Sequence, residues 1–140
     1  MSGKVSVAVS SLLLVLAWRP GQAMECPAIP IPLAEAIMEV HTCLTAMSRP
    51  IKSSEYDAVQ GFLMDCAEKT QQGTSNPLVF MMLACSDANY LDKTAYCMFD
   101  QEQAIFKKLN LDPNEQKVAD KIFKCLKEMH AQLVQKRSKA

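Results

Sequence analysis

The chain has 140 residues, with 15 Lys and Arg against 15 Asp and Glu, so its formal net charge at pH 7 is zero. A balanced charge gives no electrostatic reason to expect binding to nucleic acid or broad adsorption to anionic membranes. The length suits a single domain.

The first 23 residues have the layout of a secretory signal peptide. An early cation, Lys4, precedes an apolar run from Val5 to Trp18, and small residues follow at Gly21 and Ala23. The apolar run is shorter than the roughly 20 residues that a membrane-spanning helix needs. We therefore predict cleavage after Ala23, no membrane span, and a secreted, extracellular protein of residues 24–140.

Cleavage would change the charge balance. The removed segment contains two cations and no acids, which leaves 13 basic and 15 acidic residues and a net charge of 13 − 15 = −2. The last 24 residues, 117–140, carry seven cations against two acids. We expect a single domain that ends in a basic C-terminal tail.

Six cysteines lie beyond the predicted signal peptide: Cys26, Cys43, Cys66, Cys85, Cys97 and Cys125. An even count in a small secreted chain predicts three disulfides, although six cysteines allow 15 pairings that the sequence does not decide between. Zinc sites usually contain cysteines two to four residues apart. Here Cys85 and Cys97, the closest pair, are separated by eleven residues, so the spacing favours disulfides.

The first expected helix follows the proline-rich stretch 26–32. Its apolar residues recur at helical spacing: Leu33, Ile37, Val40, Leu44 and Met47. The helix should end before Pro50, because a residue that precedes proline disfavours the helical conformation.

A second helix should begin with Ser53 or Ser54 as its N-cap. Its apolar stripe comprises Tyr56, Val59, Leu63 and Cys66. Residues 71–77 read as a loop. Asn76 and Pro77 then start a short, almost entirely apolar helix, "LVFMMLAC", which we expect to form the buried centre of the fold.

Residues 86–90 interrupt the chain, after which helix should continue to about Leu109 with a break near Asp100. Asp112, Pro113 and Glu115 have the arrangement of an N-cap, a first helical position and a capping box. The last helix carries one apolar face: Val118, Ile122, Cys125, Met129 and Leu133.

No segment alternates polar and apolar residues in the manner of strands joined by hairpins. The prediction is therefore an all-α domain, a compact array of five or six short helices held together by three disulfides. We expect it to be a monomer.

The sequence favours a binding protein over an enzyme. It contains no phosphate-binding loop, nucleophile elbow or closely spaced histidine pair. His41 and His130 are weak candidates for metal ligands. Methionines are frequent, and they suit an apolar core, the lining of a pocket or Cu(I) ligation. If a pocket for a small apolar ligand exists, the candidate lining residues are Leu78, Phe80, Met81 and Met82.

The cysteine segments resemble those of the microplusin/hebraein group of tick antimicrobial proteins. "YCMFDQEQAIFKKLNLDPNEQKVADKIFKC" is similar to the last segment of that family, and "AIMEVHTCL" and "YDAVQGFLMDC" are similar to its second and third cysteine segments. The segment between Cys66 and Cys97 is longer here, and the histidine-rich ends of that family are absent. The resemblance implies a secreted, all-helical fold and an antimicrobial action through the withholding of copper or iron.

Three functional hypotheses follow. The first is a secreted antimicrobial or immune-effector protein of microplusin type that acts on microbes by sequestering nutrient metal. The second is a secreted helical carrier of a small apolar ligand, or a salivary module that binds a host protein. A lytic peptide released from the basic C-terminus ranks last, because the apolar face of that helix is expected to belong to the core.

Overall fold

The computed structural model describes residues 26–139; segment 1–25, which holds the predicted signal peptide, and Ala140 lie outside the described residues. The described chain forms six α-helices and no strand, which confirms the predicted all-α fold. The helices are α2 (Leu33–Leu44), α3 (Ser53–Thr70), α4 (Pro77–Ser86), α5 (Ala88–Asp100), α6 (Glu102–Leu109) and α7 (Pro113–Lys139).

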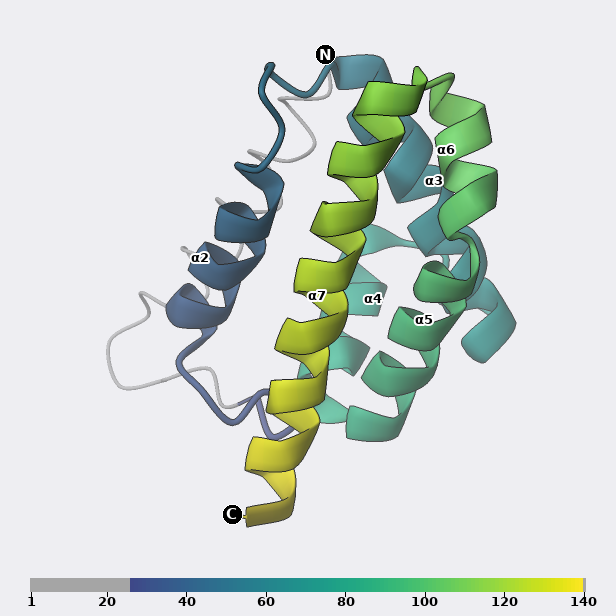
Figure 1. Ribbon diagram of the computed structural model, residues 1–140. Helices are drawn as coiled ribbons and strands as arrows, with labels where there is room; N and C mark the ends of the chain where they lie inside the picture. Colours follow the sequence, from purple (N-terminus) through teal and green to yellow (C-terminus); the bar gives the residue numbers. More distant parts are fainter. Residues whose placement is uncertain (1–25, 140) are drawn as a thin grey trace.

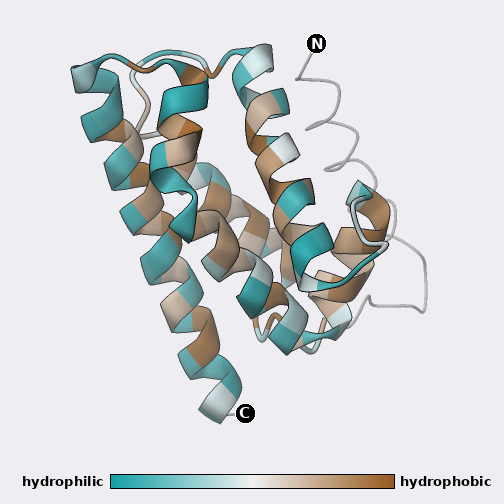
Figure 2. Ribbon diagram, turned by 90° about the vertical axis from the view of Figure 1, so that its right-hand side faces the viewer, coloured by the Kyte–Doolittle hydropathy of each residue, from teal (hydrophilic) through white to brown (hydrophobic). Residues whose placement is uncertain are grey.

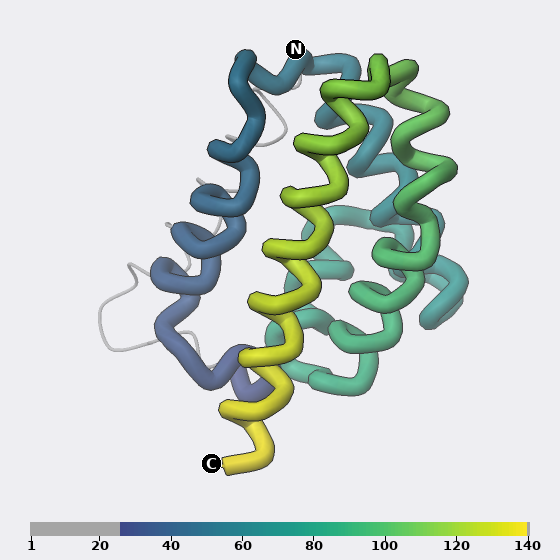
Figure 3. Tube along the Cα trace, viewed as in Figure 1, coloured from purple at the N-terminus to yellow at the C-terminus, as the bar shows by residue number. Residues whose placement is uncertain are grey.

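Helix α7 is the longest helix of the described chain, and α2, α5 and α6 pack against it. It runs along the height of the molecule, with α2 on one side and α5 and α6 on the other (Figure 1). Helix α3 packs against α4, α5 and α6, whereas the main neighbour of α2 is α7. The tube view shows α2 and α7 side by side although they stand near opposite ends of the chain (Figure 3). Among residues 26–139, no helix combines the length and the apolar character needed to cross a membrane.

Three disulfides connect these helices, as the cysteine count predicted. Cys26–Cys85 joins the segment before α2 to the end of α4, Cys43–Cys125 joins α2 to α7, and Cys66–Cys97 joins α3 to α5. Each bridge therefore links elements that are distant in sequence. Such links stabilise a small domain mainly by restricting its unfolded chain.

Two of the predicted helix starts are confirmed by their hydrogen bonds. At α4, the Asn76 side-chain oxygen accepts hydrogen bonds from the backbone N–H groups of Leu78 and Val79, at 2.9 and 3.3 Å. At α7, the Glu115 N–H donates to the Asp112 carboxylate at 2.8 Å, and the Asp112 N–H donates to the Glu115 carboxylate at 3.3 Å. The reciprocal pair is the capping box that the sequence indicated.

The predicted serine cap of α3 is wrong. The helix begins at Ser53 itself, and the residue before it is Lys52. Neither Ser53 nor Ser54 precedes the helix, so neither can take the extended conformation of an N-cap. Instead, the Glu55 carboxylate accepts a hydrogen bond of 2.8 Å from the Lys52 N–H.

The break expected near Asp100 is present, since α5 ends there and α6 starts at Glu102. Helix α6 ends at Leu109, and the φ of 53° at the next residue, Asn110, places it in the left-handed region. Asparagine is one of the few residues other than glycine that tolerates this conformation at a helix end.

Two groups of buried side chains pack together in the described part of the hydrophobic core. The first group comprises the buried residues Ile105, Phe106, Leu111 and Ala119, packed on by Phe62 and Phe123 among others. The second comprises Ala67, Ala84 and Tyr90, with Phe80, Leu83 and Leu91 packed on them. The larger part of the core therefore lies among α3, α6 and α7.

The expectation that α4 is the buried centre is wrong. Only Ala84 and Cys85 of this helix are buried, and Leu78 and Met82 are 45% and 57% exposed. Among the helices it packs mainly on α3 and α5, and one face of its nearly all-apolar sequence remains at the surface. Val40 of α2, also expected in an apolar stripe, is exposed as well.

The guanidinium of Arg49, in the segment between α2 and α3, binds residues at the N-terminal ends of α3 and α7. It donates to the Glu55 carboxylate at 2.7 and 2.9 Å and to the Glu115 carboxylate at 2.7 Å. Glu55 is buried, and the hydrogen bonds from Arg49 hold the pKa of its carboxyl below the usual range. The same contacts raise the pKa of Arg49. Glu115 thus closes the α7 capping box and also binds Arg49.

Replacing Asp112 by alanine should lower the free energy of unfolding by about 0.5–2 kcal/mol, because the Glu115 N–H at the start of α7 loses its acceptor. Urea denaturation followed by circular dichroism measures the change. Asp112→Asn keeps a side-chain oxygen at the same place and serves as the control, with a much smaller loss expected. Equal losses for the two variants would contradict a capping role.

Candidate functional site: a groove between α2 and α7

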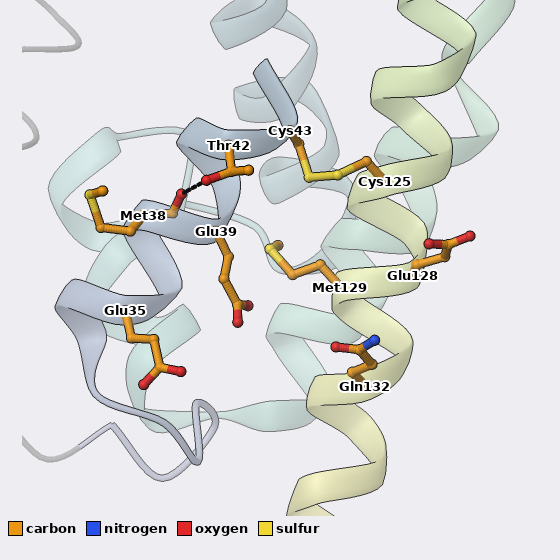
Figure 4. Close-up of a pocket in the computed structure, with 9 residues that line it drawn as sticks. All are labelled: Glu35, Met38, Glu39, Thr42, Cys43, Cys125, Glu128, Met129 and Gln132. Atoms are coloured by element: carbon orange, nitrogen blue, oxygen red, sulfur yellow. Dashed lines mark hydrogen bonds between the residues drawn. A yellow bond between two sulfur atoms is a disulfide. The ribbon is translucent and has the colours of Figure 1, made fainter. Parts of the chain in front are cut away.

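A groove of about 480 Å³ lies between α2 and α7 (Figure 4). One wall is contributed by α2, through Glu35, Met38, Glu39, Thr42 and Cys43. The other wall is contributed by α7, through Cys125, Glu128, Met129 and Gln132. The groove is open to solvent along its length, since most of these residues are exposed or half-buried.

The α2 wall follows from helical periodicity. Glu35, Met38, Glu39 and Thr42 are spaced three, four and seven residues from the first of them, which places them on one face of the helix. The Thr42 hydroxyl donates to the Met38 carbonyl at 2.8 Å, so it is satisfied within α2. The face turned toward α7 is thus a mixed polar and thioether surface rather than a core stripe.

The Cys43–Cys125 disulfide fixes the distance between the two walls. Its Cα atoms are 5.6 Å apart, and Cys43 is the one buried residue of α2. Figure 4 shows the bridge at one end of the groove, with Glu39 and Met129 extending into the space beyond it. The disulfide therefore holds α2 against α7, although α2 buries no other residue.

The groove carries acidic side chains and no basic one. Glu35, Glu39 and Glu128 line it, and no Lys, Arg or His does. Within residues 26–139, none of the ion pairs involves these three glutamates. Met38, Met129 and the disulfide sulfurs supply the apolar, polarisable part of the surface.

The two histidines that the sequence singled out lie on different helices and in different surroundings. His41 is exposed in the last turn of α2. His130, in contrast, is buried on α7, where it is 7% exposed. The described part of the chain holds no group of three or more His, Cys, Asp or Glu side chains placed to bind one metal ion.

His130 instead belongs to a polar cluster between α5 and α7. Its Nε2 lies 2.8 Å from the Asp92 carboxylate, and its ring packs edge-on against Tyr96 and Phe99 at centroid distances of 5.1 and 6.0 Å. Arg137 donates two hydrogen bonds to the same carboxylate, at 2.6 and 2.9 Å. A metal ion at Nε2 would have to displace Asp92.

The cluster shifts the pKa values of Asp92 and Arg137. Hydrogen bonds from Arg137, and secondarily from His130, hold the pKa of the Asp92 carboxyl below its usual range despite partial burial. The Asp92 carboxylate in turn raises the pKa of Arg137. The basic end of α7 is therefore tied to α5 by this carboxylate.

Acid should weaken the fold through Asp92. Its folded-state pKa lies below the unfolded value of about 3.9, so its stabilising contribution is fully present above that pH and is lost as the pH falls through the folded-state pKa. Asp92→Asn should be less stable at pH 7 and should lose less stability between about pH 5 and pH 2. Urea denaturation over a pH series measures both slopes.

The matched control for this prediction is Asp57→Asn, which removes an exposed carboxylate of α3. We expect the acid dependence of this variant to follow that of the unaltered protein. If the free energy of unfolding of Asp92→Asn falls with pH in the same way as that of the unaltered protein, the Asp92 carboxylate contributes nothing to acid sensitivity.

The candidate pocket residues on α4 lie apart from the groove lining. Phe80 packs on the second core group and contacts Tyr90 with ring centroids 6.0 Å apart. Met81 is half-buried, and Leu78 and Met82 are exposed. None of the four belongs to the lining of the α2–α7 groove.

Comparisons with models of protein families, with curated proteins and with solved structures find no match to this chain. The resemblance to the microplusin/hebraein group therefore stays a prediction. The groove residues were missed at the sequence level, because only their Glu35–Met38–Glu39–Thr42 spacing was visible there. That spacing shows a shared face of a helix and does not reveal which helix stands opposite.

Proposed function

We propose that this protein is a secreted helical binding protein that sequesters a small, largely apolar ligand in the groove between α2 and α7. The observation that carries the proposal is the groove itself, whose volume of about 480 Å³ falls within the roughly 300–1,000 Å³ of small-molecule sites. Thioether and disulfide sulfurs in its lining suit an apolar body of variable shape.

Secretion is supported by the disulfides and by the predicted signal peptide. Three disulfides use every cysteine of the described chain. Disulfides persist in oxidising compartments such as the extracellular space. The predicted signal peptide agrees with that location. A secreted binder of this kind would act by lowering the free concentration of its ligand.

Metal withholding, which the resemblance implies, has weaker support. It would rest on the exposed His41 and on His130, whose Nε2 is engaged by Asp92. Copper sites in proteins generally draw on several nitrogen or sulfur ligands, and the residues described supply no such group. The microplusin-type antimicrobial action remains a prediction that copper binding tests directly.

The test is a titration of the mature, oxidised protein with the neutral fluorescent probe N-phenyl-1-naphthylamine, beside a calorimetric titration with Cu(II). We expect one probe molecule per chain with a micromolar Kd and no tight copper binding. Gln132→Trp places a large side chain in the groove and should weaken probe binding at least about tenfold, a loss of about 1.4 kcal/mol. Gln135→Trp, on the same helix but outside the lining, is the matched control.

Other outcomes separate the remaining functions. If the protein takes up no probe but binds copper tightly, and His41→Ala abolishes the copper binding, then metal withholding replaces ligand carriage as the function. Probe uptake that Gln132→Trp leaves unchanged would move the site away from the groove. Absence of both activities would favour a protein partner, for which the exposed Leu78 and Met82 of α4 are the first surface to alter.

A further inference from the structure

The charge of the groove indicates more about its ligand than its volume does. Glu35 and Glu39 stand one helical turn apart on α2, Glu128 stands on the facing helix, and the lining contains no basic side chain. Elsewhere, Glu55 and Glu115 share Arg49, and Asp92 binds Arg137. The groove glutamates have no such cation in the described chain.

A bare metal ion does not fit this arrangement. A divalent cation needs several ligands that converge on one point, and no three carboxylate, imidazole or thiol groups of residues 26–139 do so. The carboxylates are instead distributed over both walls of a groove of about 480 Å³. Such a distribution complements the charge of a larger organic molecule, whose cationic end reaches one wall while its body fills the space.

The lining also favours one kind of organic cation. Quaternary ammonium groups are usually held over aromatic rings, and none of the lining residues is aromatic. A primary ammonium donates N–H groups, and carboxylates such as Glu35 and Glu39 are strong acceptors for them. Sulfur atoms make favourable contacts with aromatic rings. Met129, which Figure 4 shows extending toward α2 near the Cys43–Cys125 bridge, supplies such an atom.

We propose that the α2–α7 groove selects amphipathic primary amines, with the ammonium bound at Glu35 and Glu39 and an aromatic or apolar body lying on Met129 and the Cys43–Cys125 disulfide. The proposal rests on the proposed function, because it names the ligand class of the same groove. It adds a charge requirement that a carrier of neutral apolar compounds does not have.

The test compares two probes that differ in one charge. Dansylcadaverine carries a primary ammonium at the end of its chain, and its N-acetyl derivative is neutral there. We expect the mature protein to bind the amine about tenfold more tightly than the acetylated probe at low salt. Because exposed charges are screened, the ratio should approach one in about 0.5 M NaCl.

Glu35→Gln/Glu39→Gln should bring the ratio of the two affinities close to one, mainly by weakening the binding of the amine. Asp57→Asn/Asp65→Asn removes two exposed carboxylates of α3 that lie outside the groove lining, and this control should keep the tenfold ratio. Circular dichroism of each variant establishes that the helices are retained.

The outcomes distinguish this proposal from the proposed function. Equal affinities for the two probes in the unaltered protein, or a ratio that survives in Glu35→Gln/Glu39→Gln, would overturn amine selectivity and leave a carrier of apolar ligands standing. Failure of both dansyl probes and of the neutral naphthylamine probe to bind would overturn both. If the α3 control lowers the affinity ratio as much as Glu35→Gln/Glu39→Gln does, the preference for the amine arises from net charge. Selectivity by the groove would then also be overturned.

Discussion

Replacing Cys43 and Cys125 together by alanine should lower the free energy of unfolding by about 4–5 kcal/mol and abolish ligand binding in the groove. The two residues are separated by 82 positions, and a cross-link over a loop of that length restricts the unfolded chain by about this amount in the chain-entropy model. The loss in stability is measurable by urea denaturation under non-reducing conditions.

The effect on the groove has a local cause. Helix α2 packs chiefly against α7, and Cys43 is the single buried residue within it. Without the bridge, little apolar burial holds this wall in place. Cys66→Ala/Cys97→Ala removes the bridge between α3 and α5 and should cost stability while sparing probe binding. Unchanged probe affinity in Cys43→Ala/Cys125→Ala would mean that packing alone positions α2.

Replacing Leu133 by aspartate should cost at least about 3 kcal/mol, because the change removes a buried side chain and places a charge against apolar neighbours. Leu133 is 9% exposed on the inner side of α7. Gln135→Asp introduces the same charge at an exposed position two residues away and should change stability by less than about 0.5 kcal/mol. Thermal unfolding followed by circular dichroism gives both values.

This pair of variants also bears on the basic tail. Figure 2 shows brown residues among teal ones along most of α7, whereas its last five residues, 135–139, are polar. If Leu133→Asp melts at the temperature of the unaltered protein, the apolar side of this segment faces solvent and is free to bind a membrane. A large drop in melting temperature would place that side in the folded core and argue against a lytic role.

Short-range chemistry explains why much of the helical arrangement was predictable from the sequence. Asn76 and Asp112 cap helices through bonds to residues two or three positions away, and the pattern of such bonds is visible in the sequence alone. The interruption between α5 and α6 and the all-α class were equally local inferences. The predicted serine caps of α3 failed because both serines lie within the helix, and Glu55 binds the Lys52 N–H instead.

The sequence by itself thus determined the helical class, most helix ends and the presence of three disulfides, because each depends on residue type and on neighbours within a turn. Only the tertiary structure decided which of the 15 cysteine pairings forms, that apolar α4 keeps one face at the surface, and that His130 is buried against Asp92, 38 residues away in the sequence. The tertiary structure also forms the groove, whose lining residues extend in sequence from Glu35 on α2 to Gln132 on α7. These features depend on contacts between distant segments, and a helical spacing specifies a face without specifying what packs against it.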